Sequence, residues 1–170
     1  VMYIPTLNDL SQKQWEIQDL PLKGRYLIKG GPGSGKTIIA LRRTEAIKKE
    51  SPGTTIGAFL FTNALNDFFS DAMDSLMIRT GVRVWAKWQM AFLRNHGQTW
   101  ARGEKVPWQN LSDMILRYEV SPEFDHLIID EAQDFGDSDI RVMNLLAENI
   151  TVFADRNQTI HMAETGNDRV

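Results

Sequence analysis

A glycine-rich octet, GGPGSGKT, occupies residues 30–37, between a short apolar stretch and a segment with a helical pattern. It matches the P-loop pattern G-x-x-x-x-G-K-T at every specified position. Glycines let successive backbone N–H groups turn toward one phosphate, and the helix that follows offers its positive N-terminus to the same charge. The pattern predicts that Lys36 reaches the β- and γ-phosphates of ATP and that the Thr37 hydroxyl binds Mg²⁺. The octet residues expected to bind the nucleotide are Gly31, Pro32, Gly33, Ser34, Gly35, Lys36 and Thr37.

A second motif whose side chains could take part in catalysis is DEAQD at 130–134, which directly follows the apolar run HLII. An apolar strand that ends in Asp130 would bring this carboxylate beside the Mg²⁺ of a P-loop. Glu131 comes next and is suited to orient and deprotonate the attacking water. The pair favours hydrolysis of ATP by water over transfer of a phosphoryl group to a bound acceptor. Five nearby acids, in a stretch without Lys or Arg from 118 to 140, are interpreted as solvated loop residues: Glu119, Glu123, Asp125, Asp137 and Asp139.

Buried strands alternate with helices along the chain, and these elements must position both motifs. The segment 25–29 predicts a strand that enters the octet, and 126–129 predicts a strand that enters DEAQD. Such an alternation predicts an α/β fold, with a parallel sheet covered by helices on both faces. Residues 86–118 are predicted as a helical insertion, and VRVW at 82–85 is a further candidate strand. The other predicted elements are strands at 55–62 and 150–154 and helices after Ser11 and at 37–49, 64–79 and 139–149.

Length and composition indicate one globular domain. The chain has 170 residues, of which 42% are hydrophobic and 24% charged, values that argue against a disordered or fibrous protein. A net charge of −3 gives no global attraction for nucleic acid, so such a partner would need a local patch. The absence of cysteine excludes disulfides and thiolate chemistry. No membrane span or signal pattern is visible, so we expect a cytoplasmic location, and the chain ends suggest a fragment of a longer protein.

One stretch mixes basic and aromatic side chains. Five basic residues lie from Arg83 to Lys105, interleaved with Trp85, Trp88, Phe92 and Trp100. Such a mixture is suited to stacking on bases and neutralising phosphates. The helical spacing of the first three aromatic residues is, however, more typical of a buried stripe, and this interpretation is favoured. The histidines show no metal-ligand spacing: His96, His126 and His161.

Taken in order, several motifs resemble those of superfamily 1 helicases of the UvrD/Rep type. These are the octet, the DEAQD box and ADRNQTI at 154–160, with LSQKQ at 10–14 and FTNALNDF at 61–68 as weaker matches. The resemblance implies that residues 1–170 form a single RecA-like ATP-binding motor domain, with the helical insertion at 86–118 inside it. It also implies Mg²⁺ and ATP as cofactors, single-stranded DNA as a partner, and a second RecA-like domain beyond this segment. The motif residues are compatible with single-stranded RNA as well as DNA, and no membrane partner is implied.

The resemblance also assigns roles to single residues. Gln14 should contact adenine, and Arg43 falls where the family has an arginine near the nucleotide. Gln158 should sense the γ-phosphate, for which an uncharged amide is suited because it can bond both water and phosphate. Thr62 and Asn63 fall in the motif that touches the DNA strand. Two departures are the Ala154-Asp155 pair where the family has Gly-Asp, and VWAKW at 84–88 where the family has Thr-Phe-His-Ser.

Two other functions compete with a motor. A P-loop kinase would need a lid with clustered arginines, which the sequence does not show, and Glu131 argues for hydrolysis instead. A nucleotide-controlled scaffold or switch in a repair or defence assembly would keep Lys36 but could dispense with Glu131. The sequence therefore favours the ATP-binding domain of a DNA helicase or translocase.

Overall fold

The structure, a computed structural model, describes residues 14, 16–17, 19–31, 35–60, 63–77 and 81–155, and all statements below concern these residues. Five strands form one sheet in the order β1-β5-β4-β2-β3, and every neighbouring pair is parallel. The predicted α/β class is therefore confirmed. The strands are β1 (Arg25–Gly30), β2 (Ile56–Leu60), β3 (Gly81–Val84), β4 (Phe124–Ile129) and β5 (Ala147–Asp155).

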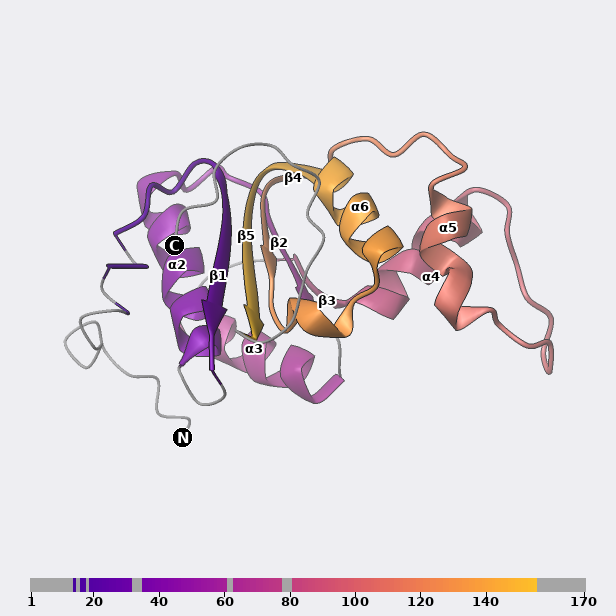
Figure 1. Cartoon of the computed structure of the whole chain (residues 1–170), viewed down its shortest axis with the longest axis horizontal. Coiled ribbons are helices and arrows are strands. Elements are labelled where there is room, and N and C mark those ends of the chain that lie inside the picture. The colour runs from indigo at the N-terminus through magenta and orange to yellow at the C-terminus, as the bar shows by residue number, and fades with distance from the viewer. Residues whose placement is uncertain are drawn as a thin grey trace.

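Helices cover both faces of this sheet, as predicted (Figure 1). On β4, the side chains of Leu127 and Ile129 pack toward one set of helices, whereas Ile128 packs toward the other, because successive strand residues point to opposite faces. All three side chains are buried, as expected for a strand enclosed on both faces. One face is covered by α2 (Lys36–Glu50) and α3 (Asn63–Ser75), and the other by α4 (Trp85–Asn95), α5 (Leu111–Ile115) and α6 (Asp137–Leu146).

The parallel sheet brings the ends of its strands to one edge. In the register of β1 and β5, Gly30 lies opposite Asp155, and in that of β4 and β5, Ile129 lies opposite Val152. The octet after β1, the DEAQD box after β4 and the end of β5 therefore meet at the carboxyl edge of the sheet. Ligands of open α/β sheets bind at this edge.

Some element boundaries differ from the predictions. The helix predicted over 139–149 ends at Leu146, and the strand predicted from 150 begins at Ala147. The physical reason is pairing, because Ala147 lies opposite Phe124 and Asn149 opposite His126 in the β4 ladder. The helix predicted over 64–79 ends at Ser75, ahead of Met77, which has a positive φ of 56°. The candidate strand at 82–85 is found as the edge strand β3.

The aromatic stripe of α4 belongs to the core, so the favoured interpretation is confirmed for Trp85 and Trp88. Their rings are stacked with centroids 4.9 Å apart, and only 4% and 3% of their surfaces are exposed. Phe92 is partly buried against the same cluster. Base stacking by the two tryptophans is therefore not supported, because their rings are covered by protein.

Three of the acids interpreted as solvated loop residues have structural partners, although Glu123 and Asp125 are also exposed to solvent. Asp139 accepts hydrogen bonds from Trp85 Nε1 at 2.9 Å and from Ser112 Oγ at 2.5 Å. Glu123 accepts one from Trp88 Nε1 at 2.9 Å. The Asp125 carboxylate accepts from both the backbone N–H and the hydroxyl of Thr55. Asp139 thus fastens the predicted insertion, with α4, the short 3-10 helix η2 (Trp108–Asn110) and α5, onto α6.

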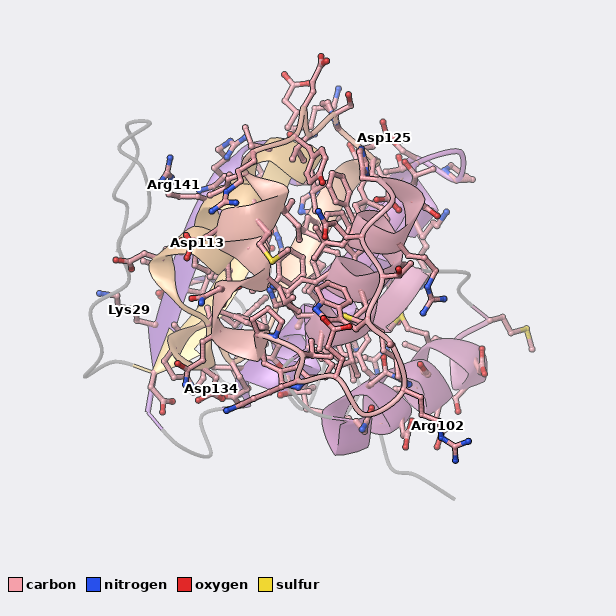
Figure 2. All side chains as sticks on the ribbon, turned by 90° about the vertical axis from the view of Figure 1, so that its right-hand side faces the viewer. Lys29, Arg102, Asp113, Asp125, Asp134 and Arg141 are labelled. Atoms are coloured by element: carbon pink, nitrogen blue, oxygen red, sulfur yellow. The ribbon has the colours of Figure 1, made fainter. Side chains whose placement is uncertain are left out.

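Figure 2 shows the molecule from the side of α4, α5 and α6. Arg102, on the loop before η2, and Arg141, on α6, are both exposed on this face. None of the helices in the described ranges combines the length and the apolarity needed to cross a bilayer.

Candidate nucleotide-binding site

Gly35, the last glycine of the octet, directly precedes α2. Its φ of 79° lies in the left-handed region that favours glycine. A Cβ added there would lie 2.5 Å from Nε2 of Gln14, so this amide would have to move. At Gly31, by contrast, a Cβ would meet open space. Three of the predicted nucleotide-binding residues lie outside the described part of the chain: Pro32, Gly33 and Ser34.

Lys36, at the start of α2, bonds three oxygen atoms at the carboxyl edge. Its ammonium donates to the carbonyls of Gly30 and Gly31, at 2.9 and 3.0 Å, and to Asp155 Oδ1 at 3.1 Å. The side chain is only 9% exposed, so the cation is held inside the site. Asp155 ends β5, and sequence reasoning did not assign it a role beyond its place in ADRNQTI. Its signal was available, since the predicted strand at 150–154 delivers it to the same edge.

Thr37 and Asp130 converge from different elements, as the two motifs predict. The Thr37 hydroxyl donates to Asp130 Oδ2 at 2.8 Å, across 93 positions of sequence. Asp130 is fully buried, and this burial raises the pKa of its carboxyl group, with the negative charge of Glu131 adding to the effect. The hydrogen bond from Thr37 acts in the opposite direction. The ionised carboxylate is thus only partly compensated by the protein.

This donor set fits Mg²⁺. A hydroxyl and a buried, under-compensated carboxylate are oxygen ligands of the kind that this ion prefers. No cluster of three or more His, Cys, Asp or Glu side chains suited to a metal occurs among the described residues. A P-loop Mg²⁺ takes few ligands from the protein and the others from phosphates and water, so such a cluster is not required. Thr37 and Asp130 would hold the ion, which when bound would neutralise charge on the phosphates.

Glu131 has a backbone conformation that is uncommon for a residue with a side chain. Its φ and ψ are 53° and 45°, in the left-handed region. Such conformations cost about 1–3 kcal/mol and are concentrated at functional sites. The turn leads into the short 3-10 helix η3 (Ala132–Asp134), and the backbone N–H of Glu131 donates to Asp130 Oδ1 at 2.9 Å. The predicted general base therefore occupies a strained position directly beside Asp130, the carboxylate predicted to bind the metal.

Gln133 connects the DEAQD box to the end of β5, which the sequence analysis did not foresee. Its Nε2 donates to the carboxylate of Glu131, and its Oε1 accepts from the backbone N–H of Asp155 at 3.2 Å. Since Asp155 in turn accepts from Lys36, the predicted base and the P-loop lysine are linked through two intermediate residues. The only signal in the sequence was the place of Gln133 inside the box.

Acidic side chains crowd this edge. The pKa of Asp134 is raised by partial burial and by the charges of Glu131 and Asp155. Among them, Asp155 forms an ion pair with Lys36. The resulting negative field favours a cation such as Mg²⁺.

The remaining predicted residues have different outcomes. Gln14 lies beside the P-loop, with its amide against Gly35, and its contact with adenine stays a prediction. Asn63 is the exposed first residue of α3, and its contact with a strand stays a prediction too. Thr62 and Gln158 lie outside the described residues.

Arg43 requires a correction. Its side chain is fully buried, and all three nitrogen atoms of the guanidinium donate to protein oxygens. The acceptors are the carbonyls of Leu20 and Pro21 and the hydroxyl of Thr151. A direct contact with nucleotide is not supported, because these bonds and the burial leave the guanidinium no open side.

Comparisons with known proteins identify the family to which the chain belongs. A family profile described as AAA domain matches residues 14–164. Among solved structures, the chain is similar to domain III of the replication initiation protein DnaA from Thermotoga maritima, with 16% identity and a TM-score of 0.42. That similarity covers 85% of this chain and 49% of the other, so the chain spans about half the length of that structure. No curated protein matches the chain. Because the family profile extends over most of its length, the chain belongs to the AAA domain family.

Proposed function

We propose that this P-loop domain hydrolyses Mg-ATP as the first motor domain of a DNA helicase or translocase. The observation that carries the proposal is the pairing of Thr37 with Asp130 at 2.8 Å, next to Glu131 in its strained conformation. A kinase would need a bound acceptor in place of the attacking water, whereas Glu131 in this proposal would activate water. The order of the sequence motifs supports movement on a strand as the purpose of hydrolysis.

Each residue has a role in this proposal. Lys36 would bind the β- and γ-phosphates, and Thr37 and Asp130 would hold Mg²⁺. Glu131 would orient the attacking water and take its proton. Gln158 would sense the γ-phosphate, and Thr62 and Asn63 would contact single-stranded DNA. A second RecA-like domain of the same protein would complete the site, and a cytoplasmic location would give access to ATP and DNA.

The test is ATP turnover by the intact protein with and without single-stranded DNA. We expect turnover to rise at least about tenfold with DNA. The same measurement with single-stranded RNA of matched sequence shows which of the two nucleic acids stimulates turnover. Lys36→Ala should abolish turnover. Glu131→Gln should lower it by about 100-fold or more while ATP binding is kept, since removing a general base costs this much. Turnover that ignores every nucleic acid would contradict the motor and leave an ATPase.

A second candidate is a nucleotide-controlled scaffold or switch without unwinding activity. The bond between Lys36 and Asp155 favours it, because a phosphate would compete for the same ammonium and so give the edge of the sheet two arrangements. A switch of this kind responds to the binding of nucleotide and does not need hydrolysis. The Glu131→Gln variant should therefore bind the partner of the scaffold as the wild type does. Loss of function in that variant would exclude the scaffold.

A further inference from the structure

Arg43 is a buried cation without an acidic partner among the described residues. Its surface is 0% exposed, and no described Asp or Glu lies within ion-pair distance. Its charge is compensated by three oxygen acceptors and by the ring of Tyr26, whose centroid lies 5.2 Å from the guanidinium carbon. Burying a charge without a carboxylate partner is costly, so the three hydrogen bonds and the ring contact must offset that cost. The segments that carry the three acceptors are therefore held close to Arg43.

Arg43 carries a positive charge at neutral pH, whereas the neighbouring His126 is neutral. Burial lowers the pKa of Arg43 to about 10, so the guanidinium stays charged at neutral pH. His126 shares the Thr151 hydroxyl with it, through Nε2 at 3.1 Å. Burial and the charge of Arg43 together lower the pKa of His126 to about 4, so the imidazole is neutral.

The three hydrogen bonds of Arg43 join three separate segments. Nη1 and Nη2 donate to the consecutive carbonyls of Leu20 and Pro21 at 3.1 and 2.6 Å, and Nε donates to Thr151 at 2.9 Å. Arg43 itself lies on α2, two turns after Lys36. A planar guanidinium can make such divergent bonds at once, whereas a lysine ammonium has no comparable fork.

Each of these segments carries part of the nucleotide site. The segment that ends at Leu20 and Pro21 contains Gln14, whose amide lies against Gly35. Helix α2 begins with Lys36, and β5 ends with Asp155. Apolar packing supports the first segment on the same face, since Ile17 and Leu20, together with Leu22 just after it, are partly buried against the cluster that includes α2.

We infer that Arg43 is a positioning residue that holds the Gln14 segment against the P-loop and thereby sets recognition of the nucleobase, without touching the nucleotide. The inference rests on the proposed nucleotide-binding function and on the predicted contact of Gln14 with adenine. Control of base specificity would then lie in two partly buried hydrogen bonds, to carbonyls 23 and 22 positions away in the sequence. The triphosphate, which the P-loop holds, should be insensitive to it.

The test measures binding of ATP, GTP and inorganic tripolyphosphate to the intact protein. Arg43→Lys keeps the charge but loses the fork, so we expect about tenfold weaker ATP binding and a smaller preference for ATP over GTP. Binding of tripolyphosphate should change less than about twofold. The matched control is Arg42→Lys on the same helix, whose guanidinium bonds Glu45 at 2.7 Å, and it should leave all three affinities unchanged. Equal weakening of ATP and tripolyphosphate by Arg43→Lys would overturn the inference, because it would indicate a phosphate contact.

A second variant keeps the inference testable should Arg43→Lys fold poorly. Gln14→Ala should reproduce the loss of ATP preference, and the double variant should be no worse than either single one. Additive losses would overturn the inference, since they would show that Arg43 acts independently of Gln14. This binding test is independent of DNA stimulation. A protein that prefers ATP over GTP, but whose turnover does not respond to DNA, would contradict the motor function and would leave the role of Arg43 unaffected.

Discussion

The ammonium of Lys36 lies 3.1 Å from Oδ1 of Asp155, although 119 positions separate the two residues in the sequence. The bond joins the start of α2 to the end of β5, at the edge where phosphates are expected. Through the backbone N–H of Asp155 and the side chain of Gln133, the same contact reaches Glu131. Any ligand that draws Lys36 away from Asp155 would therefore alter the surroundings of the predicted base.

Asp155→Asn should bind ATP more tightly than the wild type. The substitution removes a competitor for Lys36 and a negative charge that repels phosphate. A partly exposed ion pair is worth about 0.5–1 kcal/mol, so we expect the dissociation constant to fall about two- to fivefold. Titration with ATP measures it, and Asp137→Asn, on the exposed first turn of α6, is the control. Weaker binding would instead show that Asp155 assists the nucleotide.

Asp130→Asn should stabilise the protein without ligand while it abolishes Mg²⁺-dependent turnover. Burial raises the pKa of Asp130 in the folded state, so keeping it ionised at neutral pH costs folding free energy. The amide removes this cost and can still bond Thr37. A thermal melt should therefore show a higher midpoint. Asp125→Asn should have the opposite effect, because bonds from Thr55 lower the pKa of Asp125 and stabilise its charged form. A lower midpoint for Asp130→Asn would contradict the prediction.

Asp139→Ala should loosen the attachment of α4 and α5 to the core. Its carboxylate accepts bonds from Trp85, Gln89 and Ser112, and from the backbone N–H of Gly136. Deleting it leaves buried donors unpaired, at a cost of about 3 kcal/mol in the free energy of unfolding. Urea denaturation measures this loss. Asp137→Ala, in the same helical turn but exposed, should cost only about 0.5 kcal/mol. Similar losses for both variants would show that the buried bonds carry no special weight.

His126 should make the fold sensitive to mild acid. Its pKa is about 4 in the folded state and about 6.5 when unfolded, so the unfolded chain binds more protons between these values. Stability from this group is complete above pH 6.5 and is lost as the pH falls toward 4. Between pH 6.5 and 4.5 we expect the wild type to lose about 2 kcal/mol more than His126→Gln. The exposed His96 provides the control, since His96→Gln should behave like the wild type. Equal losses in all three proteins would contradict the assignment.

The fold class and the convergence of Lys36, Thr37 and Asp130 could be predicted from the residues alone. The spacing of the glycines, Lys36 and Thr37 in the octet is typical of a P-loop. The alternation of apolar runs with helical patterns predicts a parallel sheet. In such a sheet the carboxyl ends of strands share one edge, so residues that follow β1 and β4 meet there whatever the details of packing. For the same reason the strand leading to Asp155 could be predicted, although its bond to Lys36 could not.

Which side chains pair with one another became visible only in the folded protein. Arg43 was expected to meet the nucleotide because of its place after the octet, but its guanidinium is enclosed by the carbonyls of Leu20 and Pro21 and by Thr151. Asp139 was expected to be solvated, yet it bonds an indole 54 positions away. Local sequence patterns give the periodicity and spacing of residues. The hydrogen-bond partners of side chains such as Arg43 and Asp139 depend instead on how the helices pack against the sheet and on which buried polar atoms need a partner.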